Sequence, residues 1–318
     1  LNNKKLDIAL VEAGERYFSD KSQEYYLGET EGDFPRKLSI ARLSMFGGTT
    51  GHWGGTSRPL DYYDFKKWPF DKKKIDPYLK DAAKILEVKN SFKEETVNQN
   101  LKLIEFQVSK ITFGEKFYDD IINSKNISLF LNSPMIEILG KDQLCQKIKC
   151  FSKISGNFFF IEGKIFIVAS GGIENSRILL LENNKNKNLF TKNMPIGNYW
   201  YEHPFKKLGK AIVSKKKLKK ELNTSLNHFV NMFQHGDNSD AYSFAPSHKL
   251  IKNEKILNSC CWLVVAGYMN DDWKKVTKNM LCVAPNFSKK LLKNFNKKIA
   301  CGATVYSSWE QDPEYSNR

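Results

Sequence analysis

Five glycines within ten residues constrain this chain more than any other feature of its sequence. The stretch covers residues 46–55 and reads Phe-Gly-Gly-Thr-Thr-Gly-His-Trp-Gly-Gly. Glycine destabilises the interior of helices and strands, so this stretch predicts a loop. Such a loop offers many backbone N–H groups that can approach a planar ring or a phosphate closely. His52 and Trp53 lie at its centre.

The composition predicts a folded chain of two domains without a membrane span. The chain has 318 residues, of which 41% are hydrophobic and 13% aromatic. No apolar run reaches the roughly 18 residues that a membrane-spanning helix needs. The six cysteines show no metal-ligand spacing, so we expect reduced thiols and no metal site.

The formal net charge of +15 suggests a nucleic-acid partner at first sight. However, only six of the 50 basic residues are arginine, the residue that dominates bidentate contacts to nucleic acids. We therefore expect no nucleic-acid partner. The lysine-rich run 215–220 is interpreted as a solvated face.

A short apolar run at residues 6–11 predicts a strand that ends at Glu12 and turns at Gly14. In dinucleotide-binding folds an acid at this position accepts hydrogen bonds from the ribose hydroxyls. The glycine-rich phosphate turn of such folds lies about 20 residues before the acid. Only eleven residues precede Glu12, and the first of them is not Met. We therefore expect this turn to be missing and the chain to be a truncated piece whose targeting signals are lost, with a cytoplasmic location as the default.

The second half of the first domain combines a hairpin series with a strand–turn–helix unit. Turn signals separate short strands predicted at residues 127–131, 135–139, 146–152 and 158–161. The continuously apolar run Ile165–Ala169 predicts a strand buried on both faces. Gly171 and Gly172 then lead into a helix from Ile173, which would place its first backbone N–H groups beside an anion.

The remaining segments complete a two-domain division. A helical periodicity covers residues 68–88, and a polar loop is expected at 89–100. Apolar runs at 262–266, 280–284 and 300–309 predict antiparallel strands. Residues 1–205 would form a partial cofactor domain with a helical and loop insertion at about 61–125. Residues 206–318 would form part of a substrate domain.

In this order the motifs resemble those of the glucose-methanol-choline family of FAD oxidoreductases. The resemblance covers nearly the whole chain and is weak over residues 206–300. The matching blocks are Val11–Gly14, Gly47–Gly55 with Arg58–Leu60, Met135, Ala169–Leu180, Gly197–Pro204, and Trp309–Pro313 with Ser316–Arg318.

The resemblance implies an α/β fold, α+β overall. A truncated Rossmann-like FAD-binding domain with a β-meander would be joined to part of an antiparallel-sheet substrate domain. It implies oxidation of the CH–OH group of an alcohol or sugar, with hydride transfer to flavin N5. The electron acceptor is left open among oxygen, a quinone and a haem protein. The first phosphate turn is absent, Ser170 replaces the usual Ala, and no His matches the catalytic base of the family. We therefore assign no catalytic residue and expect the chain alone to be inactive.

The resemblance also implies a set of cofactor-binding residues. His52 has three interpretations: a packed loop residue, a noncovalent flavin neighbour, or a covalent attachment point. Two other classes stay open for the whole chain, an inactive fragment that retains part of a flavin pocket and another flavoprotein such as an aromatic hydroxylase. The predicted FAD-binding residues are Glu12, Gly47, Gly48, Thr49, Thr50, His52, Trp53, Gly54, Gly55, Met135, Gly171 and Gly172.

Overall fold

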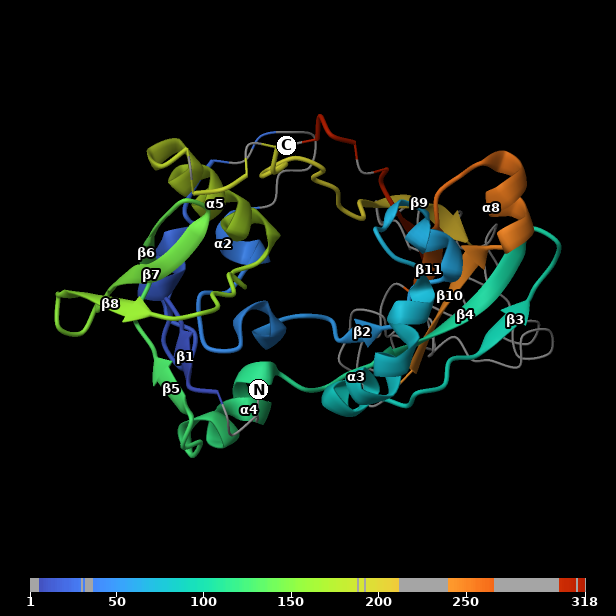
Figure 1. Ribbon diagram of the computed structural model, residues 1–318. Coiled ribbons are helices and arrows are strands. Elements are labelled where there is room, and N and C mark those ends of the chain that lie inside the picture. Colours follow the sequence, from blue (N-terminus) through green and yellow to red (C-terminus); the bar gives the residue numbers. More distant parts are fainter. Residues whose placement is uncertain are drawn as a thin grey trace, which may run out of the picture. The chain divides into compact units, whose positions relative to one another are not determined.

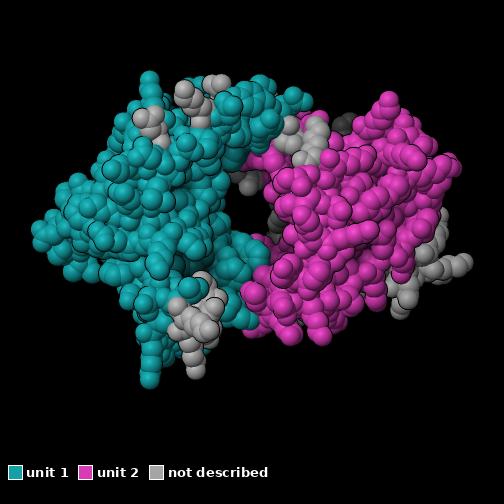
Figure 2. All heavy atoms as spheres, viewed as in Figure 1, with its two compact units in different colours: residues 1–53, 111–200, 313–318 teal, residues 54–110, 201–312 magenta. Residues whose placement is uncertain are grey.

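The chain divides into two compact units (Figure 2). Unit 1 comprises Leu1–Trp53, Ile111–Trp200 and Pro313–Arg318, and unit 2 comprises Gly54–Lys110 and Tyr201–Asp312. The sequence boundary after residue 205 left residues 54–110 in the first domain. They lie in unit 2 because a strand of this segment pairs with a strand of the C-terminal half. The computed structural model describes residues 6–29, 31, 37–187, 189–191, 193–211, 240–265, 303–312 and 314–317.

Unit 1 contains two small sheets (Figure 1). Strands β1 (Ile8–Val11) and β5 (Ile127–Phe130) pair in parallel. An antiparallel sheet follows, with the order β6–β7–β8. These five strands confirm the predicted ones at 6–11 and between 127 and 161, with ends shifted by one or two residues. The sheet contains β6 (Met135–Lys141), β7 (Leu144–Phe151) and β8 (Phe158–Glu162).

The longest helix of unit 1, α5 (Gly172–Lys185), confirms the predicted helix after the glycine turn. Gly171 precedes it with φ of 86° and ψ of 160°, a conformation open only to glycine. Ile178 of α5 packs with Ile138 of β6 and with Leu189 in a buried cluster. The shorter helices of unit 1 are α1 (Asp20–Gln23), η1 (Glu24–Tyr26), α2 (Leu38–Ala41), η2 (Gly48–Gly51) and α4 (Phe113–Ile122).

The predicted strand Ile165–Ala169 is wrong. These residues form no regular element, and the side chains of Ile165 and Ile167 are 80% and 83% exposed. An apolar run becomes a strand only where another strand pairs with it. Among the described residues β1 and β5 pair with each other, and no strand pairs with this segment. Of the run, Val168 packs against the buried cluster of α5.

Unit 2 is built on one seven-stranded antiparallel sheet in the described part of the chain. Its strand order is β2–β4–β10–β11–β12–β9, with β3 pairing on β4. The core on this sheet includes Val108, Ala241 and Trp262. This sheet confirms the expectation of antiparallel strands after residue 206. The strands are β2 (Thr56–Ser57), β3 (Glu94–Thr96), β4 (Leu101–Val108), β9 (Phe205–Ala211), β10 (Asp240–Pro246), β11 (Ser259–Val265) and β12 (Ala303–Trp309).

The connections of unit 2 differ from the sequence prediction at two places. The predicted helix over 68–88 is limited to α3 (Leu79–Leu86), because prolines at 69 and 77 lack the N–H that a helix interior requires. The predicted loop at 89–100 contains the edge strand β3, whose exposed polar residues gave no alternating signal. The predicted run at 280–284 lies outside the described residues. The remaining helices in the described part of unit 2 are η3 (Tyr62–Lys67), η4 (Lys72–Lys74), η5 (Asp76–Tyr78) and α8 (His248–Glu254).

No helix among the described residues has the length and hydrophobicity that crossing a bilayer demands.

Candidate functional site

Glu12 lies at the carboxyl end of β1, where the ends of two parallel strands meet. Its N–H donates to the carbonyl of Phe130 at 2.9 Å, and its own carbonyl accepts from Ser133 N–H at 2.9 Å. One carboxylate oxygen of Glu12 accepts from the N–H of Gly14 at 2.7 Å. Backbone hydrogen bonds thus connect the turn after β1 with the turn after β5. Open α/β sheets bind their ligands at this edge.

The glycine-rich loop begins directly beside this turn. Phe46 N–H donates to the carbonyl of Glu15 at 2.8 Å, and Glu15 forms a parallel bridge with Met45. A Cβ added to Gly14 would lie 2.1 Å from the carbonyl oxygen of Ser44. The sequence predicted Glu12 and the loop as separate motifs, and the structure brings the start of the loop against the Glu12 turn.

The loop itself is held by the chain's own backbone. Gly47 has φ of 85°, and a Cβ there would lie 2.2 Å from the backbone nitrogen of Gly114 in α4. The Thr50 hydroxyl donates to the carbonyl of Gly47 at 2.5 Å and accepts from Phe113 N–H at 3.1 Å. The need for glycine at 47 therefore follows from packing against α4. Gly48, with φ of 56°, has no described atom within 4 Å of an added Cβ.

At the centre of the loop, some side chains are exposed to solvent and one is held by a hydrogen bond. Thr49 and His52 are exposed, and His52 N–H donates to the carbonyl of Thr49 at 3.2 Å. Trp53 is anchored, because its indole N–H donates to the carbonyl of Ile111 at 3.0 Å and its ring lies beside Phe113. The exposed His52 side chain argues against its interpretation as a packed loop residue.

The last two glycines of the loop belong to unit 2. A Cβ on Gly55 would lie 2.0 Å from the carbonyl oxygen of Ser109, and φ of Gly55 is 65°. Gly54 is exposed. The structure thus places Gly54 and Gly55 in a different unit from Gly47 and His52.

Met135 and the second glycine turn also lie in unit 1. Met135 packs against the cluster of Ile138 and Ile178, so its side chain has a core role. The turn at Gly171 and Gly172 is exposed. Asn175 closes this turn, since its Oδ1 accepts from Ser170 N–H at 2.8 Å and its Nδ2 donates to the carbonyl of Val168 at 3.1 Å.

Electrostatic interactions link the Glu12 turn with the first turn of α5. Burial raises the pKa of Glu12, against the lowering effect of the Gly14 amide and of Lys153. Burial also raises the pKa of Tyr26, which the charge of Arg42 lowers and the charges of Glu12 and Glu174 raise. Glu12 and Glu174 therefore both act on Tyr26. Arg42 Nη1 lies 3.9 Å from Glu174 Oε2.

Sequence reasoning missed Tyr26, Arg42 and Lys153, because none of them belongs to a local motif. Gln23, also missed, fixes the backbone beside them. Its amide nitrogen donates to the carbonyls of Ser39 and Arg42, and its Oε1 accepts from Ser44 N–H at 3.1 Å.

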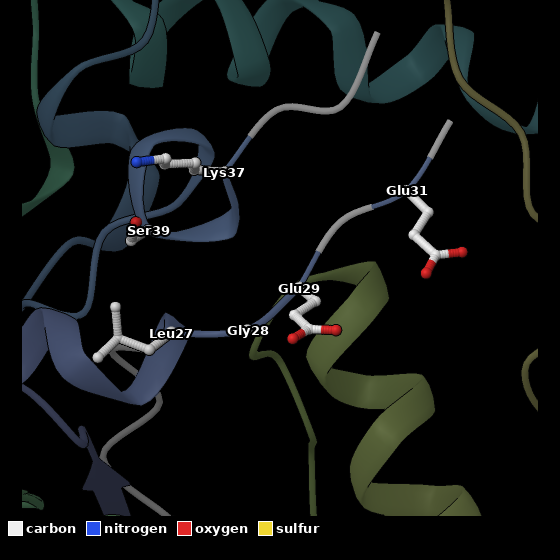
Figure 3. Close-up of a pocket in the computed structure, with 6 residues that line it drawn as sticks. All are labelled: Leu27, Gly28, Glu29, Glu31, Lys37 and Ser39. Atoms are coloured by element: carbon white, nitrogen blue, oxygen red, sulfur yellow. The ribbon is translucent and has the colours of Figure 1, made fainter. Parts of the chain in front are cut away.

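A pocket opens along the same segments (Figure 3). Its volume is about 490 Å³. Leu27 directly follows Tyr26, and Ser39 lies in α2, which ends before Arg42. Two of its lining residues are therefore close in sequence to Tyr26 and Arg42. Its lining residues, none of which was predicted from the sequence, are Leu27, Gly28, Glu29, Glu31, Lys37 and Ser39.

Among the described residues, unit 2 contains His203 and His248. The His203 carbonyl accepts from the Ser308 hydroxyl at 3.2 Å. The His248 ring stacks on Tyr63 with 5.5 Å between ring centroids. His228 and His235 lie outside the described residues. Within the described ranges, no three His, Cys, Asp or Glu side chains are grouped to hold a metal ion.

No protein-family model matches the chain, and no curated protein matches it.

Proposed function

We propose that this chain is the FAD-binding part of an oxidoreductase that acts on the CH–OH group of an alcohol or sugar. The observation that carries the proposal is the half-buried Glu12 carboxyl at the carboxyl end of β1. A carboxylate offers about four acceptor positions. The amides of Ala13 and Gly14 use part of this capacity. The rest suits the two hydroxyls of an adenosine ribose.

The surrounding residues fit the adenosine end of such a cofactor. Arg42 and Lys153 place positive charge beside Glu12 and Tyr26. The open turn at Gly171 presents the N-terminal amides of α5, a favourable place for a phosphate. His52 is exposed on the loop that starts beside the Glu12 turn.

FAD, when bound, would accept the hydride from the alcohol carbon. The residues of this chain would hold and orient the cofactor: Glu12 the ribose, the Gly171 turn a phosphate, and His52 the edge of the flavin ring. We assign no catalytic base to the chain. The substrate would be a small alcohol or sugar, and the reduced flavin would pass its electrons to oxygen, a quinone or a haem protein.

The test is a titration of the purified protein with FAD, followed by flavin fluorescence and absorbance. Glu12→Ala should weaken FAD binding about 10- to 100-fold, because hydrogen bonds to a charged group contribute about 1.5–3 kcal/mol each. Glu162→Ala is the matched control, since Glu162 is an exposed acid at the end of β8. Wild-type protein that binds no FAD, or a Glu12→Ala variant with wild-type affinity, would refute the proposal.

A further inference from the structure

Lys153 carries buried hydrogen-bond donors that no described acceptor satisfies. Its Nζ atom is buried without a hydrogen-bond partner among the described residues. It lies over the ring of Tyr25, 4.2 Å from the centroid. An aromatic face attracts the charge of an ammonium but does not replace acceptors for its three N–H donors. Leaving such donors buried and unpaired is unfavourable, so a ligand with acceptor oxygens would be stabilised here.

Arg42 shows the same arrangement on the neighbouring tyrosine. Its Nε and Nη1 are buried without a hydrogen-bond partner in the described part of the chain. Its guanidinium carbon lies 4.2 Å from the centroid of the Tyr26 ring. The Glu174 oxygen at 3.9 Å from Nη1 is beyond the limit of about 3.2 Å for a hydrogen bond. Gln23 binds the Arg42 carbonyl, so the backbone of this residue is fixed independently of its guanidinium.

Lys153 interacts with the carboxyls of Glu15 and Glu12, whereas the acid beside Arg42 is Glu174, 3.9 Å from its Nη1. Tyr26 lies within electrostatic range of Arg42, Glu12 and Glu174, so Arg42 also belongs to the surroundings of the Glu12 turn. Arginine and lysine with free donors are the side chains that bind phosphate oxygens in proteins. Glu12 itself would repel a phosphate and suits a hydroxyl group. An acceptor for hydroxyl groups in the same neighbourhood as two cations with unbonded donors suits the chemistry of a nucleoside phosphate.

We propose that Lys153 and Arg42 bind the phosphate group of an adenine nucleotide whose ribose lies on Glu12. This inference rests on the proposed function and adds to it a phosphate site outside any glycine-rich turn. Binding would move the Nζ of Lys153 and the guanidinium of Arg42 from the tyrosine rings to phosphate oxygens. The tyrosine rings then remain as the wall of the site.

The experiment is isothermal titration of the purified protein with FAD, ADP and adenosine. ADP and adenosine differ only in the phosphates, so their ratio of affinities reports the phosphate site. Lys153→Gln and Arg42→Gln should each weaken ADP binding about 10- to 100-fold and leave adenosine binding unchanged. Lys153→Arg and Arg42→Lys keep the charge and should retain most of the ADP affinity. Lys141→Gln, at an exposed lysine of β6, controls for the overall positive charge.

The outcomes separate the two proposals. ADP binding that depends on Lys153 and Arg42 supports the phosphate site even if FAD does not bind, in which case the flavin assignment fails. FAD binding that depends on Glu12 but not on Lys153 or Arg42 overturns the phosphate site and leaves the flavin assignment standing. Equal affinities for ADP and adenosine in the wild type, an equal loss in Lys141→Gln, or no binding of any ligand also overturn it.

Discussion

Gly14 and Ser44 approach so closely that a Cβ on residue 14 would lie 2.1 Å from the Ser44 carbonyl oxygen. This contact joins the turn that carries Glu12 to the segment that leads into the glycine-rich loop. Gly14→Ala should therefore destabilise the protein by at least about 1–3 kcal/mol, because backbone must shift to admit the methyl group. Urea unfolding measures the effect. Gly28→Ala is the control, since among the described atoms its Cβ would meet Leu38 Cδ1 alone, at 3.7 Å. An equal loss in both variants would contradict the prediction.

Gln23 fixes three backbone groups at once, the carbonyls of Ser39 and Arg42 and the N–H of Ser44. Because Gln23 is buried, Gln23→Ala leaves these groups without their side-chain partner. We expect a loss of about 1–3 kcal/mol for each group that water cannot reach. Thermal and urea unfolding provide the measurement. The exposed Gln146 of β7 supplies the comparison, because Gln146→Ala should change stability by less than about 0.5 kcal/mol.

Thr49 and Thr50 are adjacent in the loop but have different roles. The Thr50 hydroxyl bridges the carbonyl of Gly47 and the N–H of Phe113, whereas Thr49 is exposed. Thr50→Val keeps the shape and removes both hydrogen bonds, so we expect a loss of about 1–3 kcal/mol. Thr49→Val should be near neutral. Hydrogen exchange of residues 46–53 would show faster opening in the Thr50 variant alone, and equal exchange in the two variants would refute the bridge.

The pKa of Glu12 gives the stability a definite pH dependence. Burial raises this pKa in the folded protein above its ordinary value of 4.5, so the folded state binds the proton more tightly than the unfolded state. The free energy of unfolding contributed by Glu12 therefore falls as the pH rises from about 4.5 through the folded pKa. Glu12→Gln removes this titration while its amide oxygen can still accept from Gly14 N–H.

Unfolding of the wild type and Glu12→Gln is compared at a series of pH values. The stability of the wild type should fall relative to the variant as the pH increases to neutrality. Asp64 and Glu310, whose pKa values are also raised by burial, are present in both proteins and cancel in the difference. A difference that does not change with pH would exclude the raised pKa.

The sequence predicted the local part of this architecture. The apolar run before Glu12, the hairpin strands and the helix after Gly171 all depend on near neighbours, and they are present. Ile165–Ala169 was mispredicted because hydrophobicity alone cannot show whether a partner strand exists. For the same reason the sequence did not predict the edge strand β3, because this strand is defined by its pairing with β4.

The candidate site was predictable only where a motif signals it. Glu12 stands out because it follows a strand and precedes a glycine. Lys153 and Arg42 carry no such signal, since their positions beside Glu12 and Tyr26 come from segments far away in the sequence. The glycine pattern also could not distinguish a backbone that packs on the chain from one that approaches a ligand. Gly47 and Gly55 are in the first situation, and Gly171 leaves its Cβ side open.

The exposed ring of His52 makes the mode of flavin attachment directly testable. His52 contributes its backbone N–H to the η2 turn, so His52→Ala should change the unfolding free energy by less than about 0.5 kcal/mol. Any effect of the substitution on the cofactor then reports the imidazole ring itself. We expect weaker FAD binding in His52→Ala, whereas Glu162→Ala, at the exposed acid that ends β8, should bind FAD as the wild type does.

Acid precipitation of the FAD-loaded protein distinguishes a covalent bond from contact, because only a covalent bond survives denaturation. We predict that the yellow colour appears in the supernatant for both the wild type and His52→Ala, as expected for a noncovalent neighbour of the flavin. Colour in the wild-type pellet that is lost in His52→Ala would establish covalent attachment at His52 instead. Wild-type affinity in His52→Ala, together with colour in the supernatant, would remove His52 from the flavin site.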